Sequence, residues 1–210
     1  MSSSVLTAIR AVVSLGTVLA APAAFANSFA GTSSPGALPD AYQAALQTLG
    51  IDVLVPGTVP PGFTVSKLEV EPCPVDYPYR EGEICRFGPA YRITYRDDNS
   101  TCFAIEAVGG GVGGAVPEYS FDVETALFGV VPIGFGQFGF QPGQPIGPSR
   151  QMPTLDQRQS PQANTMSGWM GTGPFYRVVT DLQNDNVFPC FRSITPEAVG
   201  EIVTTLKWLD

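Results

Sequence analysis

The sequence contains no histidine and only two lysines, Lys67 and Lys207, and each scarcity excludes a set of functions. Without histidine there is no Ser-His-Asp or Cys-His hydrolytic centre, no histidine-ligated zinc and no histidine acting as a general acid or base. The formal net charge is −8. A chain this acidic is a poor partner for the phosphates of nucleic acids and for anionic membrane surfaces.

The N-terminus has the pattern of an export signal. Arg10 precedes the apolar run Ala11–Ala20, and Ala24-Phe25-Ala26 offers the small-x-small sequence that signal peptidases cleave. An apolar run of about ten residues is shorter than the roughly 20 that a membrane-spanning helix needs. We therefore predict a signal peptide over 1–26, a flexible leader over 27–36 and a single domain over 37–210. The protein would reside in the periplasm, the thylakoid lumen or the extracellular space.

The chain has four cysteines, Cys73, Cys85, Cys102 and Cys190. In an exported protein, four cysteines favour two disulfides, and the sequence alone allows three pairings. We favour Cys73–Cys85, which closes a short loop, together with Cys102–Cys190, which joins two distant segments. A zinc site of four thiolates is the alternative, but the close Cys-x-x-Cys pairs typical of such sites are absent.

Alternation of apolar and polar residues predicts a sheet. The clearest hairpin joins 91–96 to 101–106 through an Asp-Asp-Asn-Ser turn. Tyr91, Ile93 and Tyr95 would share one face, and Cys102 would point to the other. A second hairpin is predicted between 176–180 and 187–191.

Further strands are expected over 63–71, with a bulge near Ser66, and over 120–128 and 129–140. The segment 129–140 alternates glycine with Val, Ile and Phe, which suits a strand pressed closely against something bulky, or a bent strand. The segment 141–167 is rich in Pro, Gln, Ser and Gly and has few apolar residues. It predicts an extended or mobile excursion.

Two helices flank these strands. Asp40 is a candidate N-cap for a short helix that ends near Leu49. Near the C-terminus, Thr195 is a good N-cap and is followed by Pro196 and Glu197. The apolar stripe of this second helix would be Val199, Ile202, Val203, Leu206 and Leu209. The predicted fold class is α+β, an antiparallel sheet with a short N-terminal helix and an amphipathic C-terminal helix packed on it.

Several patterns resemble functional sites. Gly109–Gly114 fits G-x-G-x-x-G, but no helix is expected after it to hold a pyrophosphate. Asp97-Asp98-Asn99 and the segment 181–186 offer oxygen ligands to Ca²⁺ without the twelve-residue calcium loop, so turn chemistry is the simpler interpretation. Pairs of carboxylates with the i, i+2 spacing of a strand face are Glu69/Glu71, Glu81/Glu83 and Asp122/Glu124. Exposed strand faces ordinarily carry such residues, and the sequence predicts no catalytic residue, metal or cofactor.

A group of aromatic residues is the feature with most potential for contact with a ligand or partner: Phe128, Phe135, Phe138, Phe140 and Trp169. A sheet lined by these rings could hold an apolar molecule or the side chains of another protein. The alternative is that the rings form the core of the domain itself.

Short motifs at both ends of the domain resemble a family. Val59-Pro60-Pro61-Gly62-Phe63 enters a strand, and 190–198 continues from a strand into the C-terminal helix. Both are similar to a bacterial envelope domain of unknown function, related to lipoprotein-carrier-like proteins and anti-sigma-factor ectodomains. The resemblance covers 53–209 and implies a curved antiparallel sheet with helices against its concave side. It supplies no catalytic residues, and the four cysteines and the segment 129–168 depart from the family pattern.

The sequence thus predicts a non-enzymatic exported binding domain. Its curved sheet would contact a hydrophobic ligand, such as a lipid, or a protein of the envelope. An accessory subunit that docks on a membrane complex or on the cell wall is the alternative, with 141–167 as its contact arm. A carboxylate-dependent hydrolase is the third hypothesis.

Overall fold

A computed structural model describes residues 38–73, 88–110, 112–113, 116–139, 152–162, 164–180 and 190–209. These residues all fall within one compact unit. The predicted signal peptide and leader lie outside them. The described elements, in chain order, are α1 (Asp40–Gln47), β1 (Leu54–Pro56), β2 (Thr64–Glu71), β3 (Ala90–Arg96), β4 (Thr101–Val108), β5 (Val116–Thr125), β6 (Gly129–Gly139), α2 (Leu155–Gln159), β7 (Met166–Ser167), β8 (Phe175–Val179), β9 (Arg192–Ser193), α3 (Pro196–Thr204) and β10 (Leu206–Trp208).

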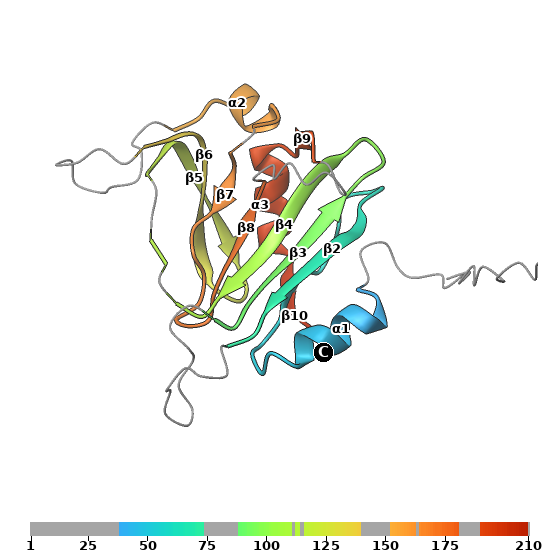
Figure 1. The fold of residues 1–210 in the computed structure, drawn as a ribbon. Helices are drawn as coiled ribbons and strands as arrows, with labels where there is room; N and C mark the ends of the chain where they lie inside the picture. The colour runs from blue at the N-terminus through green and yellow to red at the C-terminus, as the bar shows by residue number, and fades with distance from the viewer. Residues whose placement is uncertain are drawn as a thin grey trace, which may run out of the picture. The chain divides into compact units, whose positions relative to one another are not determined.

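Most of these strands belong to one sheet, with the order β2-β3-β4-β8-β7-β6-β5 (Figure 1). Neighbouring strands along this order are antiparallel, and β9 adds a short parallel pairing to β4. The strands β1 and β10 form a separate antiparallel pair. The prediction of a mainly antiparallel sheet with few helices is therefore confirmed.

The hairpin of β3 and β4 has the predicted register. Ile93 lies opposite Ile105, and Tyr95 lies opposite Phe103, with their rings stacked at a centroid distance of 4.8 Å. The turn depends on Asp97, whose Oδ1 accepts hydrogen bonds from the backbone N–H groups of Asn99 (2.9 Å) and Thr101 (2.7 Å). Such an Asx turn is favoured by the Asp-Asp-Asn-Ser sequence.

The predicted bulge is also present, because the register of β2 against β3 shifts between Val65 and Lys67. The hydroxyl of Ser66, the extra residue, donates a hydrogen bond to the carbonyl oxygen of Thr94 (3.2 Å).

The strands β5 and β6 form a hairpin whose glycines permit close approach. A Cβ on Gly134 would lie 2.7 Å from Cγ of Pro117 on the neighbouring strand, too close for any side chain. Gly136 has a φ of +87° beside the carboxylate of Glu118. Gly134 and Gly136 therefore have the close-packing origin that the sequence predicts, whereas a Cβ on Gly129 or Gly139 would meet no described heavy atom within 4 Å. The strand β5 begins earlier and ends earlier than the predicted 120–128.

The strand β8 differs from the prediction. It pairs with β4 on one edge and with β7 on the other, and Tyr176 also forms a bridge to Met170. Both of its edges thus have partners within the described residues, and most of the second arm of the predicted hairpin with 187–191 lies outside them. The predicted excursion over 141–167 also contains regular structure: α2, which begins with a capping box at Thr154 and Gln157, and β7 inside the sheet.

Both terminal helices are shorter than expected. The N-cap of α1 is Pro39, and Asp40 is its first helical residue rather than its cap. The helix α3 has the predicted cap, with the hydroxyl oxygen of Thr195 accepting from the Ala198 N–H (3.1 Å), but it ends at Thr204. Leu206 is therefore not part of a helical stripe.

A strand replaces the last helical turn because backbone pairing is available there. Leu206–Trp208 pairs with β1, and the Gly57 N–H donates to the Thr205 carbonyl oxygen (2.8 Å). The Leu209 N–H likewise donates to the Val53 carbonyl oxygen (2.8 Å). The first of these bonds gives a partner to the carbonyl of Thr205, the residue that caps the end of α3, and the second continues the pairing with β1.

The main core lies on one face of the sheet. It combines the inward residues of β3, β4, β6 and β8 with the apolar side chains of α1, α3, β1 and β10. The helix α3 contacts β5, β6, β7 and β8, and Figure 1 shows it beside β8. Tyr91 and Tyr176 tie the β1 segment to this sheet, because their hydroxyl groups bond to the backbone of Leu54 and Asp52, respectively.

Candidate binding surface

A row of alternating charges crosses the face of the sheet opposite the main core. Residues directly opposite each other on paired antiparallel strands point to the same face. The register places Glu69 of β2 opposite Arg92 of β3, Arg92 opposite Glu106 of β4, and Glu106 opposite Arg177 of β8. We call these four residues the charged row.

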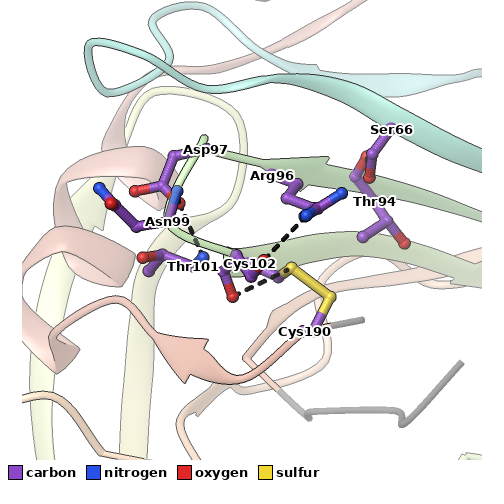
Figure 2. Close-up of a disulfide and its surroundings, with 9 residues drawn as sticks. Ser66, Thr94, Arg96, Asp97, Asn99, Thr101, Cys102 and Cys190 are labelled. Carbon is purple, nitrogen blue, oxygen red and sulfur yellow. Dashed lines mark hydrogen bonds between the residues drawn. A yellow bond between two sulfur atoms is a disulfide. The ribbon is translucent and has the colours of Figure 1, made fainter. Parts of the chain in front are cut away.

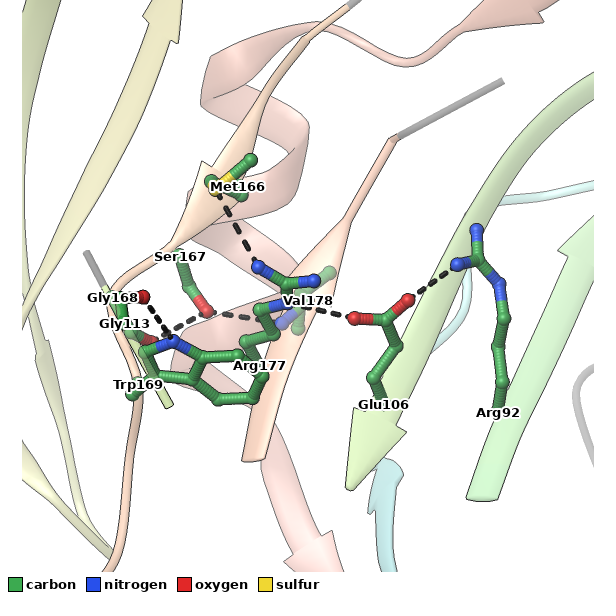
Figure 3. Close-up of polar contacts among 9 residues, drawn as sticks. All are labelled: Arg92, Glu106, Gly113, Met166, Ser167, Gly168, Trp169, Arg177 and Val178. Carbon is green, nitrogen blue, oxygen red and sulfur yellow. Dashed lines mark hydrogen bonds and ion pairs between the residues drawn. The ribbon is translucent and has the colours of Figure 1, made fainter. Parts of the chain in front are cut away.

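Glu106 is the centre of the charged row. Its Oε1 is paired with Nη1 of Arg92, and its Oε2 accepts from Nε of Arg177 at 2.7 Å (Figure 3). The Glu106 side chain is 13% exposed, against 15% for Arg92 and 26% for Arg177. Since both carboxylate oxygens have a guanidinium partner, the cost of taking this charge out of water is offset by two charge-assisted hydrogen bonds.

Trp169 extends the charged row beyond β8. The guanidinium carbon of Arg177 lies 4.3 Å from the centroid of the indole ring, which is a cation–π contact. The indole N–H donates to the carbonyl oxygen of Gly113 (3.1 Å), and Nη1 of Arg177 lies 3.8 Å from the sulfur of Met166. Figure 3 shows the indole and the guanidinium side by side. The partly exposed Trp169 ring is therefore held in one orientation.

The aromatic residues singled out in the sequence do not gather on one surface. Phe135 is 1% exposed and packs against Tyr119 and Phe121, at ring distances of 5.5 and 6.3 Å. The ring centroid of Phe128 lies 5.8 Å from that of Trp208 and 6.4 Å from that of Tyr176.

The remaining aromatic residues have different surroundings. Phe138 is partly buried on β6, and Phe140 lies outside the described residues. Trp169 is therefore distinguished from Phe128, Phe135 and Phe138 by its stacking on an arginine. Sequence reasoning missed that arginine, although the outward position of Arg177 on a predicted strand was a signal for it.

The carboxylates considered for catalysis are also dispersed. Glu69 pairs with Lys67 at 2.9 Å, Asp122 and Glu124 are exposed on the edge strand β5, and Glu81/Glu83 lie outside the described residues. The pKa of Asp97 is lowered: slight desolvation raises it, but the hydrogen bonds from Thr101 and Asn99 outweigh this effect. A lowered pKa keeps this turn carboxylate ionised.

The described part of the chain holds no group of three or more residues of the types His, Cys, Asp and Glu that could bind a metal. The predicted oxygen-ligand segment 181–186 lies outside it. The glycine-rich stretch is followed by strand β5 as the next described element.

Cys102 and Cys190 form the predicted long-range disulfide, with Cα atoms 5.6 Å apart (Figure 2). It joins the start of β4 to the segment that leads into β9 and α3. No described cysteine is free, and Cys85 lies outside the described residues, so the Cys73–Cys85 pairing stays a prediction. A disulfide is compatible with an exported protein.

No family model, curated protein or solved structure matches this chain. The resemblance to envelope domains thus stays an expectation from the sequence. In the ranges that the structure describes, no helix has both the length and the apolar character needed to cross a membrane.

Proposed function

We propose that this chain is a non-enzymatic exported domain that binds another protein through the charged row and Trp169. The observation that supports this proposal best is the Arg177–Trp169 stack at the edge of an ordered charge network. Tryptophan and arginine are the residue types most enriched among side chains that dominate binding energy at protein interfaces. Because the network holds both in place, little conformational entropy would be lost on binding.

A protein partner is favoured over a hydrophobic small molecule by the position of Phe135. An apolar ligand site needs aromatic rings that line an accessible cavity. Phe135 is instead buried among rings of its own hairpin. We therefore propose the accessory-subunit hypothesis, in which the partner is a protein of the envelope. In this proposal the sheet curves around α3.

The network itself supports a role without catalysis. A general acid or base needs a carboxyl group that can exchange a proton near neutral pH. Each carboxylate oxygen of Glu106 is instead bonded to a guanidinium group, so this carboxylate is engaged by the two arginines. We propose that it orients Arg92 and Arg177 for recognition.

Site-specific photocrosslinking in the native envelope tests this proposal. A photoreactive amino acid would replace Trp169 in one form of the full-length exported chain, and exposed Glu201 of α3 in a control form. We expect a discrete protein adduct at position 169 and none at 201, with the partner then identified by mass spectrometry. Identical adducts at both positions, or none at 169, would refute the proposed surface.

A substitution distinguishes recognition from folding. Arg177→Lys keeps the positive charge but loses the planar group that stacks on Trp169 and pairs with Glu106. To keep the indole in place, the crosslinker would stand at exposed Gly113, whose carbonyl oxygen accepts from the indole N–H and where an added Cβ would meet no described heavy atom within 4 Å. The adduct should weaken about tenfold in this variant, a loss of about 1.4 kcal/mol. An unchanged adduct in a variant with unchanged thermal stability would mean that the stack is only structural.

A further inference from the structure

The strand β5 forms one edge of the large sheet. Among the described strands its only partner is β6, although it is ten residues long. An edge strand presents backbone N–H and C=O groups that can pair with an extended segment of another chain. The two faces of β5 decide which segment could be accepted.

The inward face of β5 is occupied. A Cβ on Gly200 of α3 would lie 3.2 Å from Cγ1 of Val123 and 3.4 Å from Cε2 of Phe121, so the helix backbone already lies close to these side chains. Arg158 of α2 also covers Phe121, with its guanidinium carbon 5.1 Å from the ring centroid. An incoming strand would meet helices on this side.

The outward face of β5 is acidic. Glu118, Asp122 and Glu124 alternate along it, and all three are exposed. The Glu118 carboxylate is held beside the strand, because its Oε2 accepts from the Gln137 N–H at 3.1 Å.

The charge pattern argues against pairing between two copies of β5. The two antiparallel registers with the longest overlap that keep the acidic faces together place Glu118 opposite Asp122 or opposite Glu124. Both registers bring carboxylates directly across from each other, which is destabilising. A strand with lysine or arginine at alternate positions would instead give each carboxylate a cation, and the net charge of −8 would attract it.

We propose that the β5 edge is a docking site for an extended basic segment of another protein, which pairs with β5 as an additional antiparallel strand. Its lysine or arginine side chains lie opposite Glu118, Asp122 and Glu124. This surface is distinct from the charged row, and the proposal goes beyond the function proposed above. If binding at the β5 edge is refuted, the proposed binding at the charged row can still be tested, and the reverse also holds.

Fluorescence anisotropy with a labelled synthetic peptide tests the proposal on the oxidised exported protein. The peptide alternates lysine with threonine or valine over about nine residues, to match the length of β5. One control peptide has the same composition with its lysines contiguous. A second keeps the sequence but carries N-methyl groups on the amides that would face β5, which prevents backbone pairing without changing charge.

The alternating peptide should bind at about 20 mM salt and more weakly at about 150 mM salt, because the carboxylates are exposed. Both control peptides should bind at least about tenfold more weakly, since they cannot combine the pairing with the charge match. Equal binding of the N-methylated peptide would overturn the proposal, because attraction without strand pairing would then explain the result. No binding of the alternating peptide would also overturn it.

Two charge reversals of equal size test the position. Asp122→Lys changes the β5 edge, and Glu201→Lys changes an exposed carboxylate of α3. We expect about tenfold weaker binding for Asp122→Lys and less than about twofold for Glu201→Lys. Equal losses would overturn the proposal in favour of a diffuse electrostatic effect. Amide hydrogen exchange on the unmodified chain gives a second readout, with new protection by the peptide expected in β5, and absence of that protection would also overturn it.

Discussion

Tyr95 offers a direct test of how the core treats a buried polar group. Its ring is fully buried and stacks on Phe103, and its hydroxyl has no hydrogen-bond partner among the residues that the structure describes. Tyr91, two residues earlier on the same face of β3, is a natural control. Its hydroxyl accepts from the Leu54 N–H at 2.7 Å and donates to the Leu54 carbonyl oxygen at 3.3 Å. The two tyrosines thus share a strand and a degree of burial and differ in whether the hydroxyl is satisfied.

The substitution Tyr95→Phe should raise the free energy of unfolding by about 1 kcal/mol, because it removes a buried hydroxyl that makes no bond in the folded state. The substitution Tyr91→Phe should lower it by about 2 kcal/mol, because the buried N–H of Leu54 loses its partner. For a domain of this size, 1 kcal/mol corresponds to a change in Tm of about 2–4 °C. The two variants should therefore differ in Tm by about 6–12 °C.

Thermal and urea unfolding of the oxidised protein at neutral pH, followed by circular dichroism, would measure both changes. Equal m values for the two variants and the unmodified chain would show that the compactness of the denatured state is unchanged. If Tyr95→Phe lowered the free energy of unfolding by 1 kcal/mol or more, the assignment of an unsatisfied hydroxyl would be refuted.

Three further predictions concern other parts of the fold. Desolvation raises the folded-state pKa of Tyr91 and Tyr95 above the ordinary tyrosine value of 10.0, so unfolding at high pH releases protons. The free energy of unfolding should therefore be unaffected below about pH 10 and should fall above it by about 1.4 kcal/mol per pH unit for each of these tyrosines. Urea midpoints independent of pH up to about pH 11 would contradict the prediction. Replacing Cys102 and Cys190 by alanine should lower the free energy of unfolding by about 2–5 kcal/mol, since the bond joins residues separated by 88 positions and restricts the unfolded chain. Urea unfolding of this variant measures the loss, and a reductant should likewise lower the urea midpoint of the unmodified chain. Gly57→Ala should lower Tm by about 2–12 °C, equivalent to about 1–3 kcal/mol, because its Cβ would meet the carbonyl oxygen of Thr205. A Cβ on Gly113 would meet no heavy atom of the described residues within 4 Å, so Gly113→Ala should be nearly neutral in the same melts.

Patterns that depend on neighbouring residues could be predicted from the sequence. The β3–β4 hairpin and its register follow from strict alternation around an Asp-initiated turn. The bulge at Ser66 follows from a change of phase within one strand, and the cap at Thr195 follows from the chemistry of a helix start. The sequence allows three pairings of the four cysteines, and the Cys102–Cys190 bond that we favour is present.

The partners of β8 and the fate of the chain after Thr204 could not be predicted in this way. A strand of only five residues can pair with any strand of matching length, and here β4 and β7 occupy its edges. Leu206 continues the helical spacing of α3, but its backbone pairs with β1, from which it is separated by most of the chain. Contacts between distant segments override local periodicity because they satisfy more backbone groups.

For the candidate surface, too, some features follow from the sequence and others depend on contacts between distant segments. The sequence by itself determined that histidine-based chemistry is absent and that Trp169 and the phenylalanines were the aromatic residues to consider. Only the tertiary structure decided that Phe135 is core and that Trp169 lies on Arg177. Composition and alternation decide which side chains can face a sheet. The order in which β2, β3, β4 and β8 come together decides which of those side chains meet, and this order depends on pairing between strands far apart in the sequence.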